Sequence, residues 1–343
     1  MNLLLFLSDR CDLSCDYCFL SLNGGKPVVL AEAAALRAVD SHLSRSGARA
    51  RVTILGGEPL LHPELATAVA ARARARGAKV TLITNGTHAA PSVVEELQRL
   101  GVEIGVSLDG PAEQHDRHRR LAGGGPSHAK VLSALARLDP AALRVNMVIC
   151  EDTVGRFLSS VEWLRSRGFR RLSFHADVAR PWSEPGLRSL SAALEGFGRY
   201  ARRLAAAAPE ALSLWHLDSY RLASPDAPAD SELVLGADAR YYASDAYLCR
   251  PYGQGLEGAC GDTGTGPDFL RRGALIARAD AGVRAALAGA AVYTWPRETF
   301  LLAGLQSKDA AAAVDSYRRA DRLLGDALSA LAAELDVKSG GRV

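Results

Sequence analysis

Short runs of β-branched and aliphatic residues alternate along the first half of the chain with longer stretches whose apolar positions recur every three to four residues. A run of the first kind predicts a buried strand, and a stretch of the second kind predicts a helix with one apolar face. The expected strands are residues 2–7, 51–55, 79–84, 103–107, 144–149 and 171–175. The expected helices are residues 31–46, 63–76, 91–100, 129–138 and 153–167.

Strands that alternate with helices pair into a parallel sheet, because each helix carries the chain back to the same end of the sheet. The expected fold class is α/β, with the six strand repeats forming a partial (β/α)6 barrel of the TIM type. A doubly wound open sheet is the competing architecture. We expect the barrel at residues 1–210 and a small C-terminal α+β extension, a hairpin plus helices, at residues 211–343.

The hairpin of the extension is predicted from the loops around it. Residues 227–230 and the glycine-rich residues 253–266 have the composition of loops. Between them, residues 240–243 and 246–249 are the expected strands of the hairpin.

Three cysteines follow the first expected strand with the spacing C-x3-C-x2-C, at Cys11, Cys15 and Cys18. Three thiolates can bind three irons of a [4Fe-4S] cluster, which leaves the fourth iron without a protein ligand. A metal site keeps an open position when it acts on a bound small molecule, so the spacing predicts catalysis. No further Cys or His group lies close enough to complete a zinc site. The alternative of three buried apolar thiols fits poorly with the polar residues between them.

Composition limits the partners and the compartment. Hydrophobic residues make up 48% and charged residues 23% of the 343 positions, which is ordinary for a globular protein with a large core. The formal net charge is +3 and the arginines are scattered, so we expect no nucleic-acid partner. We also expect no membrane span, and residues 1–7 are too short for a signal sequence. An iron-sulfur cluster needs a reducing compartment, which favours the cytoplasm.

Further polar residues fall where the expected strands end, and the active site of a barrel collects at the carboxyl ends of its strands. Gly56, Gly57, Glu58 and Pro59 follow the second strand. The two glycines would let a ligand approach the backbone, and the carboxylate could accept charge-assisted hydrogen bonds from an ammonium group. The other strand ends carry Thr84, Asn85, Gly86, Ser107, Asp109, Cys150, His175 and Asp177.

The cysteine spacing, with the aromatic Tyr17 just before Cys18, resembles that of the radical S-adenosylmethionine (SAM) enzymes. The resemblance implies one [4Fe-4S] cluster whose open iron binds SAM, reductive cleavage of SAM to a 5'-deoxyadenosyl radical, and abstraction of hydrogen from a substrate carbon. It implies a reductant such as ferredoxin or flavodoxin. It also implies that the GGEP segment at residues 56–59 binds the amino group of SAM through Glu58.

The segment from Ser107 through Asp109 to Arg119 is similar to a block of the SPASM and twitch branch, whose members modify peptides and proteins. That resemblance implies that Ser107 and Arg119 contact the SAM carboxylate, a role that suits the forked guanidinium. It implies that Asn146 faces the ribose or adenine, although a polar residue at the edge of the core is the alternative. His175 and Asp177 could face substrate at the barrel mouth, with a locally satisfied His175 as the alternative, and Cys150 receives no role.

The extension departs from that branch. Residues 235–249 look like its auxiliary-cluster segment, but Leu235 replaces the first cysteine and Ser244 replaces a glycine. Only Cys249 and Cys260 remain, and two thiolates can hardly hold a complete [4Fe-4S] cluster. We therefore expect a degenerate twitch-like hairpin without a cluster, with a partly ligated or substrate-completed cluster as the alternative.

The resemblance leaves the substrate open. Modification of a ribosomal peptide, by cross-linking or a related reaction in natural-product biosynthesis, is the first hypothesis. Against it stand the eroded auxiliary site and a first strand at residue 2, which leaves no leader-recognition domain before it. Radical chemistry on a small molecule such as a nucleoside or sugar is the alternative. A non-catalytic iron-sulfur protein would not need Glu58, Ser107 or Arg119.

Overall fold

The structure is a computed structural model. It describes residues 1–18, 20, 27–46, 50–177, 180–207, 213–214, 232–248, 258–286 and 310–335. Cys249 and the loop-like residues 227–230 lie outside this part of the chain.

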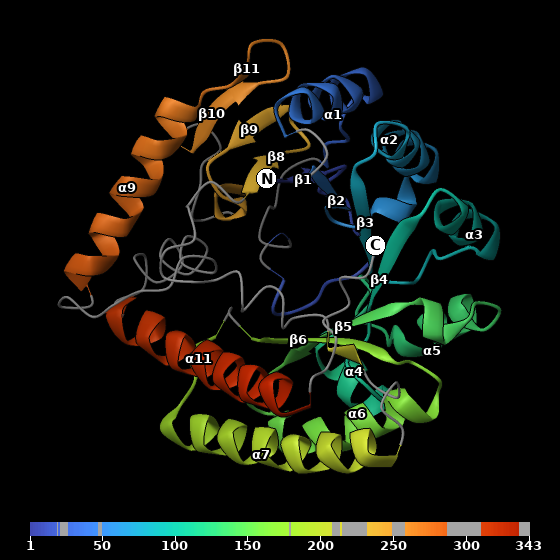
Figure 1. The fold of residues 1–343 in the computed structure, drawn as a ribbon, viewed down its shortest axis with the longest axis vertical. Coiled ribbons are helices and arrows are strands. Elements are labelled where there is room, and N and C mark those ends of the chain that lie inside the picture. The colour runs from blue at the N-terminus through green and yellow to red at the C-terminus, as the bar shows by residue number, and fades with distance from the viewer. Residues whose placement is uncertain are drawn as a thin grey trace.

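Six parallel strands in chain order form the centre of one sheet. They are β1 (Asn2–Phe6), β2 (Arg51–Leu55), β3 (Lys79–Thr84), β4 (Val102–Ser107), β5 (Arg144–Ile149) and β6 (Arg171–Ala176). Two further strands extend the parallel part, β7 (Ser213–Leu214) beside β6 and β8 (Glu232–Leu235) beside β1. The sheet curves into an open ring and its two edges are not paired with each other (Figure 1).

Helices cover the outer face of this curved sheet (Figure 1). Five of them match the expected helices: α1 (Glu32–Ser46), α2 (Pro63–Ala75), α3 (Pro91–Arg99), α5 (His128–Leu135) and α6 (Phe157–Ser166). Sequential strand order with helices on one face confirms the partial barrel. The competing doubly wound sheet is wrong, because its strand order would reverse at a switch point.

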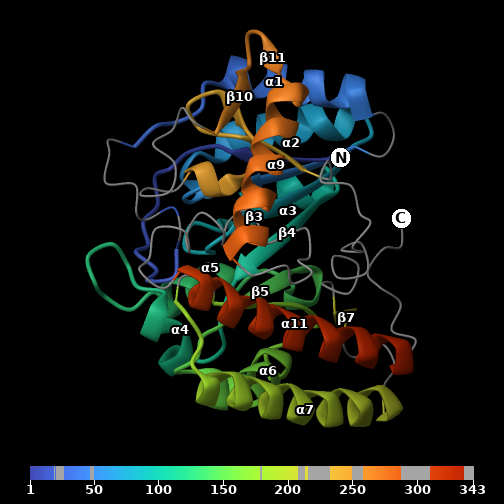
Figure 2. The same cartoon turned by 90° about the vertical axis from the view of Figure 1, so that its left-hand side faces the viewer.

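Further helices are α4 (Ala112–His118) and α7 (Glu184–Ala207), to which no element was assigned in advance, and α9 (Phe269–Ala286) and α11 (Ala310–Leu335) in the predicted extension. The 3-10 turns are Pro59–Leu61, Pro140–Ala142, Val154–Arg156 and Asp245–Leu248. In two perpendicular views α11 lies along α7, below the barrel (Figures 1 and 2). No helix in the described ranges is both long and apolar enough to cross a membrane.

Side chains of alternate residues divide between a helix-facing side and an interior side of the sheet. Phe174 of β6 packs against Phe157 and Phe197, with ring centroids 5.0 and 5.4 Å apart, so its side of the strand faces α6 and α7. The residues on either side of Phe174, Ser173 and His175, therefore face the barrel interior. The interior is polar at this point, which is unusual for a packed core and suits a binding site.

An ion network of the buried Arg144 with the half-buried Glu103 and Arg171 occupies the interior where the strands begin. Glu103 of β4 accepts a hydrogen bond from Arg144 of β5 at 3.1 Å and pairs with Arg171 of β6. Burial lowers the pKa of Arg144 to about 10, which leaves it charged at neutral pH. Because removal of one partner of a buried pair leaves an uncompensated charge, the network fixes strand positions at this end and leaves the opposite, carboxyl ends for chemistry.

The segment after β8 continues the same sheet through β9 (Arg240–Tyr242), β10 (Ala259–Asp262) and β11 (Gly266–Pro267), all antiparallel. The domain boundary at residue 210 stays a prediction. A strand at residues 240–243 is present, but the hairpin partner predicted at 246–249 is wrong, because residues 245–248 form a 3-10 turn. The true partner is β8, whose apolar residues bury against β1 and are joined to β9 by a turn with Ala239 at φ 64°.

Candidate active site

The three cysteines of the predicted cluster lie together in a loop after β1. Cys15 is buried with Tyr17, and Cys11 and Cys18 pack against the same small apolar group. The Cys18 N–H donates to the carbonyl of Cys15 at 3.0 Å. The loop is anchored from outside, because the Ser14 N–H donates to the carbonyl of Arg120 at 2.8 Å.

The GGEP segment supports this loop from the end of β2. The Gly57 N–H donates to the carbonyl of Ser8 at 2.6 Å, and the Glu58 N–H donates to the carbonyl of Arg10 at 2.8 Å. A Cβ atom on Gly57 would lie 2.1 Å from the Arg10 carbonyl, and Gly56 has φ 145°. The space next to these two glycines, which we expected a ligand to use, is thus filled by the backbone of the segment that leads into the cysteine loop.

Glu58 is fully buried and accepts three hydrogen bonds. Leu60 N–H and the Thr84 hydroxyl donate to Oε1 at 2.8 and 2.7 Å, and Asn85 N–H donates to Oε2 at 2.6 Å. Burial raises the pKa of this carboxyl to about 7 despite those donors. A carboxylate has about four acceptor sites, so little capacity is left for the SAM ammonium that the sequence assigned to it. Through its bonds to Thr84 and Asn85, Glu58 at the end of β2 connects this strand to the end of β3, whether or not it also contacts SAM.

Asn85 is a site residue that sequence reasoning placed at a strand end without giving it a role. Its amide lies 3.6 Å from the Cys11 sulfur, which also accepts the Leu13 N–H at 3.4 Å. Burial raises the pKa of Cys11 to about 11 and that of Cys15 to about 12. Hydrogen bonds to ligand sulfurs help to set the potential of iron-sulfur clusters, so Asn85 is placed to tune one.

Tyr17, Asp109 and Arg119 form a buried triad beside the cysteine loop. One oxygen of Asp109 accepts both the Tyr17 hydroxyl at 2.5 Å and the Arg119 Nε–H at 2.8 Å, and the other accepts the Val148 N–H at 3.0 Å. The Arg119 guanidinium also lies over the Tyr17 ring, 5.2 Å from its centroid. Burial opposes charge on both groups, but the Arg119 guanidinium holds the pKa of Asp109 below its usual value. The triad joins the loop to β4, α4 and β5.

His115 supports the triad from behind. Its Nδ1 accepts the Asp109 N–H at 3.4 Å, and its Nε2 lies 2.9 Å from the Ser127 hydroxyl, which donates to the carbonyl of Arg119 at 2.6 Å. This network assigns the proton of the neutral ring to Nε2. Burial lowers the pKa of His115 to about 4, so the ring is neutral near pH 7.

Acid should therefore destabilise the protein through His115. The pKa is about 6.5 when the chain is unfolded and about 4 when it is folded, so the unfolded state binds more protons between these values. Stability is complete above pH 6.5 and is lost as the pH falls toward 4. From pH 7 to 5 we expect this residue to remove about 2 kcal/mol from the free energy of unfolding.

The measurement is urea unfolding at the two pH values for the parent and for His115→Gln, which should lose that share of the pH dependence. The matched control is His88→Gln, because His88 is 38% exposed. Equal pH dependence in the parent and His115→Gln would contradict the neutral, hydrogen-bonded ring.

Ser107, Asn146 and Ser173 form one row across β4, β5 and β6, because their strands pair in that register. All three share the interior side of the sheet. The Asn146 Nδ2 is buried and has no hydrogen-bond partner among the described residues, and it lies beside Gly105, where a Cβ would come within 2.8 Å of it. An unpaired buried amide is costly unless a ligand completes it, which suits the predicted SAM contact.

His175 and Asp177 lie one step further toward the barrel mouth. Burial and the nearby Arg144 lower the pKa of His175 to about 4, so it is a neutral group near pH 7. Asp177 is buried and accepts a hydrogen bond from Arg180 Nε at 3.0 Å. Asp177 is therefore paired with Arg180, and a role for His175 or Asp177 toward substrate stays a prediction.

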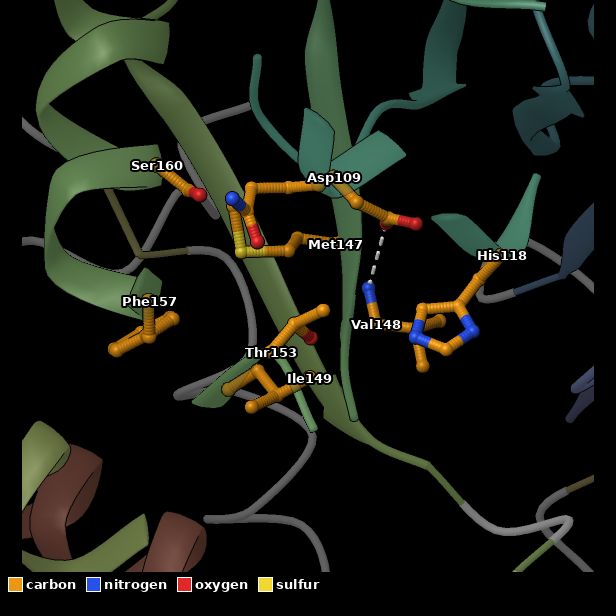
Figure 3. Close-up of a pocket in the computed structure, with 9 residues that line it drawn as sticks. Asp109, His118, Met147, Val148, Ile149, Thr153, Phe157 and Ser160 are labelled. Atoms are coloured by element: carbon orange, nitrogen blue, oxygen red, sulfur yellow. Dashed lines mark hydrogen bonds between the residues drawn. The ribbon is translucent and has the colours of Figure 1, made fainter. Parts of the chain in front are cut away.

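A small cavity lies between β5 and the helices α4 and α6, on the outer side of the sheet. Its lining includes the apolar Met147, Ile149 and Phe157 together with Asp109 and His118 (Figure 3). The Val148 N–H donates to Asp109 within this lining. This cavity is not the site that the strand ends assemble.

A three-thiol loop at the carboxyl ends of parallel barrel strands defines an iron-sulfur enzyme of the partial-barrel class. Residues 5–164 match the Radical SAM superfamily, and the chain carries a radical SAM domain. Enzymes of this superfamily use a [4Fe-4S] cluster and SAM. The residues present fit both groups, since three thiols gather without a fourth in the loop and Asn146 offers an unpaired amide to the interior.

Relatives with known activities support the assignment. The chain is 26% identical over 285 residues to GTP 3',8-cyclase of Rhodococcus opacus, covering 76% of this chain and 74% of that protein. It is 28% identical over 186 residues to PqqA peptide cyclase of Xanthomonas axonopodis pv. citri, covering 49% and 46%. Among solved structures, native anSMEcpe with bound AdoMet and Cp18Cys peptide is similar with a TM-score of 0.69 and 17% identity, covering 96% of this chain and 99% of that chain.

Proposed function

We propose that this radical SAM enzyme takes hydrogen from a carbon of a ribosomally made peptide, most simply to form a cross-link, in the biosynthesis of a natural product. The observation that carries the radical chemistry is the buried three-cysteine loop braced by the triad of Tyr17, Asp109 and Arg119. The peptide is supported by the likeness to PqqA peptide cyclase, and by the nearly full-length fold shared with the peptide-bound anSMEcpe structure.

In this proposal Cys11, Cys15 and Cys18 hold the cluster, which together with SAM supplies reductive cleavage and a radical able to take hydrogen from carbon. The chain's other residues would position SAM and the cluster ligands. Asn85 donates toward the Cys11 sulfur, and Arg119 offers its two terminal nitrogens to the SAM carboxylate, because its bond to Asp109 uses only Nε–H.

The interior row would bind the remainder of SAM. Ser107 lies on the same face as Asn146, whose unpaired amide would meet the ribose or adenine. Glu58, with Gly56, Gly57 and Pro59, holds the cysteine loop and the end of β3 in register, and a remaining lone pair of Glu58 would face the ammonium. A small reducing protein such as ferredoxin or flavodoxin would deliver the electron.

A nucleotide is the second candidate substrate. Of the two relatives described above, GTP 3',8-cyclase matches a larger part of this chain than PqqA peptide cyclase does, and the match covers about three-quarters of each protein. A neutral His175 on the polar interior side could then donate to or accept from a base or a sugar hydroxyl.

The test supplies both substrates to anaerobically reconstituted enzyme with SAM and a reductant. The peptides are those encoded by short open reading frames beside the gene, and the nucleotide is GTP. We expect 5'-deoxyadenosine to form faster with one such peptide, whose mass falls by the mass of two hydrogen atoms. Acceleration by GTP alone would replace the peptide with the nucleotide, and no 5'-deoxyadenosine under any condition would refute the radical reaction.

A further inference from the structure

Three donor atoms of different chemistry meet beside the cysteine loop, outside the predicted cluster ligands. They belong to His118 at the end of α4, Cys150 at the end of β5 and Asp152 just after it. One ligand atom from each lies within 4.8 Å of the others. His118 and Cys150 are buried, whereas the Asp152 side chain is 38% exposed.

We propose that His118, Cys150 and Asp152 bind one divalent transition-metal ion of the zinc type. Imidazole, thiolate and carboxylate are the donors that Zn²⁺ takes in proteins, at about 2.0–2.3 Å. Neighbouring donors around a tetrahedral ion at those lengths are about 3.3–3.7 Å apart. The His118 Nε2 and Asp152 Oδ1 atoms are 2.9 Å apart, so they would separate slightly, and the Cys150 sulfur, which lies within 4.8 Å of both, would move in.

Asp16 holds His118 as a metal-binding histidine is usually held. Both oxygens of Asp16 lie 3.0 Å from His118 Nδ1. With the proton on Nδ1 donated to Asp16, Nε2 has its lone pair available on the side of Cys150 and Asp152. Such carboxylate–histidine pairs orient the ring and raise the basicity of the ligating nitrogen. The Arg180 Nη2 also lies 3.3 Å from this Nδ1. The Arg180 guanidinium is held at the same time by Asp177, which accepts a hydrogen bond from Arg180 Nε at 3.0 Å.

Asp152 is held in the same manner. Its Oδ2 accepts a hydrogen bond from Arg117 Nε, while Oδ1 is the atom that faces His118. A ligating carboxylate commonly has its second oxygen hydrogen-bonded in this way. Two of the three donors thus have partners that fix the orientation needed for a shared ion.

The charge around the three donors suits a divalent cation. The Asp152 carboxylate and the ion pairs next to the three donors together amount to three carboxylates and two guanidinium groups, which leaves one negative charge, and a thiolate would add a second. These charged residues are Asp16, Asp152, Asp177, Arg117 and Arg180. A divalent ion with the Cys150 thiolate would bring the cluster of charges to neutrality, whereas a thiolate alone would add repulsion.

The position links this ion to the catalytic centre. Asp16 lies between Cys15 and Tyr17 in the chain, the Tyr17 and His118 rings are 5.9 Å apart, and Cys150 packs in the same buried group as Cys15. Three protein ligands leave a fourth position for water or for a donor atom of a substrate. The inference concerns metal binding itself and holds whether the substrate is a peptide or a nucleotide.

The first test measures zinc in the enzyme with its iron-sulfur cluster assembled, after addition of zinc and removal of excess by a weak chelator. The expected result is about one zinc per chain beside an unchanged iron content. Cys150→Ser and Asp152→Asn should each retain less than a tenth as much zinc. Because Asp152 is exposed, Asp152→Asn is not expected to disturb folding, so loss of zinc in that variant would report loss of a ligand. The matched control is Cys260→Ser, which changes a buried cysteine on β10 and should keep the metal.

The second test uses Co²⁺ in a variant that combines Cys11→Ser, Cys15→Ser and Cys18→Ser, where no cluster obscures the spectrum. We expect a thiolate-to-cobalt absorption band that disappears when Cys150→Ser is added, and a 10- to 100-fold weaker affinity with Asp16→Asn. Absence of zinc from the parent, or zinc and the cobalt band persisting without Cys150, would overturn the site. Since SAM cleavage is measured separately, failure here leaves the proposed radical reaction intact.

Discussion

Replacing Cys11, Cys15 or Cys18 by alanine should abolish reductive cleavage of SAM. Each thiolate would hold one iron of the cluster, and loss of one ligand opens a second iron and destabilises the whole group. The three cysteines pack together in the loop, where Cys15 is buried and Cys11 and Cys18 are half-buried. The measurements are iron and sulfide content, expected at about four each in the parent, and formation of 5'-deoxyadenosine.

Controls separate ligand loss from general damage to the fold. Cys260→Ala changes a buried cysteine far along the chain and should keep full iron content and cleavage. Asn85→Ala removes the amide donated toward Cys11 together with the hydrogen bonds of that side chain to Asp12 and Thr87, so it should keep the iron and shift the reduction potential of the cluster. Normal cleavage in any of the three cysteine variants would refute the ligand assignment. Parent iron near eight per chain would refute the loss of the auxiliary cluster.

The strands and the cysteine loop were predictable because their signals are local. Buried parallel strands need continuous β-branched and aliphatic runs, and the six predicted strands agree with the observed ones to within a residue at each end. The C-x3-C-x2-C spacing is also a local signal. In contrast, α4 was missed because its sequence is polar and its buried residues are Gln114, His115 and His118. The partners of His118, Asp16 and Asp152, are distant in the chain, so its burial has no local signal.

The contacts that organise the site could not be read from the sequence. Tyr17 and Asp109 are 92 positions apart, and His118 and Asp16 are 102 apart, so only the assembly and curvature of the sheet bring them together. The GGEP glycines show the same limit. Their need for space was predictable, but not that the neighbour filling it would be the backbone of Ser8 and Arg10. In the extension, pairing of β8 with β1 overrode the local hairpin signal.

Changing Arg119 should weaken SAM binding without loss of the cluster. Arg119 would present its terminal N–H groups to the SAM carboxylate from a buried position fixed by Asp109. Loss of charge-assisted hydrogen bonds in such a site costs about 1.5–3 kcal/mol, so affinity should fall by roughly one to two orders of magnitude. The measurement is SAM affinity by calorimetry, together with the change that SAM causes in the EPR signal of the cluster.

The choice of substitution follows from the triad. Arg119→Ala would leave Asp109 as an unpaired buried charge, which costs about 3–5 kcal/mol of stability, so weak binding by that variant would be ambiguous. Arg119→Lys keeps a positive charge beside Asp109 but loses the fork, and should fold, retain its iron and still bind SAM weakly. Tyr17→Phe removes only the hydroxyl donated to Asp109 and serves as the matched control within the triad. If Arg119→Lys bound SAM as tightly as the parent, the role of the guanidinium would be to fix Asp109 and the cysteine loop. Another donor on the interior face would then have to bind the SAM carboxylate, and Ser107 and Asn146 would be the first to test.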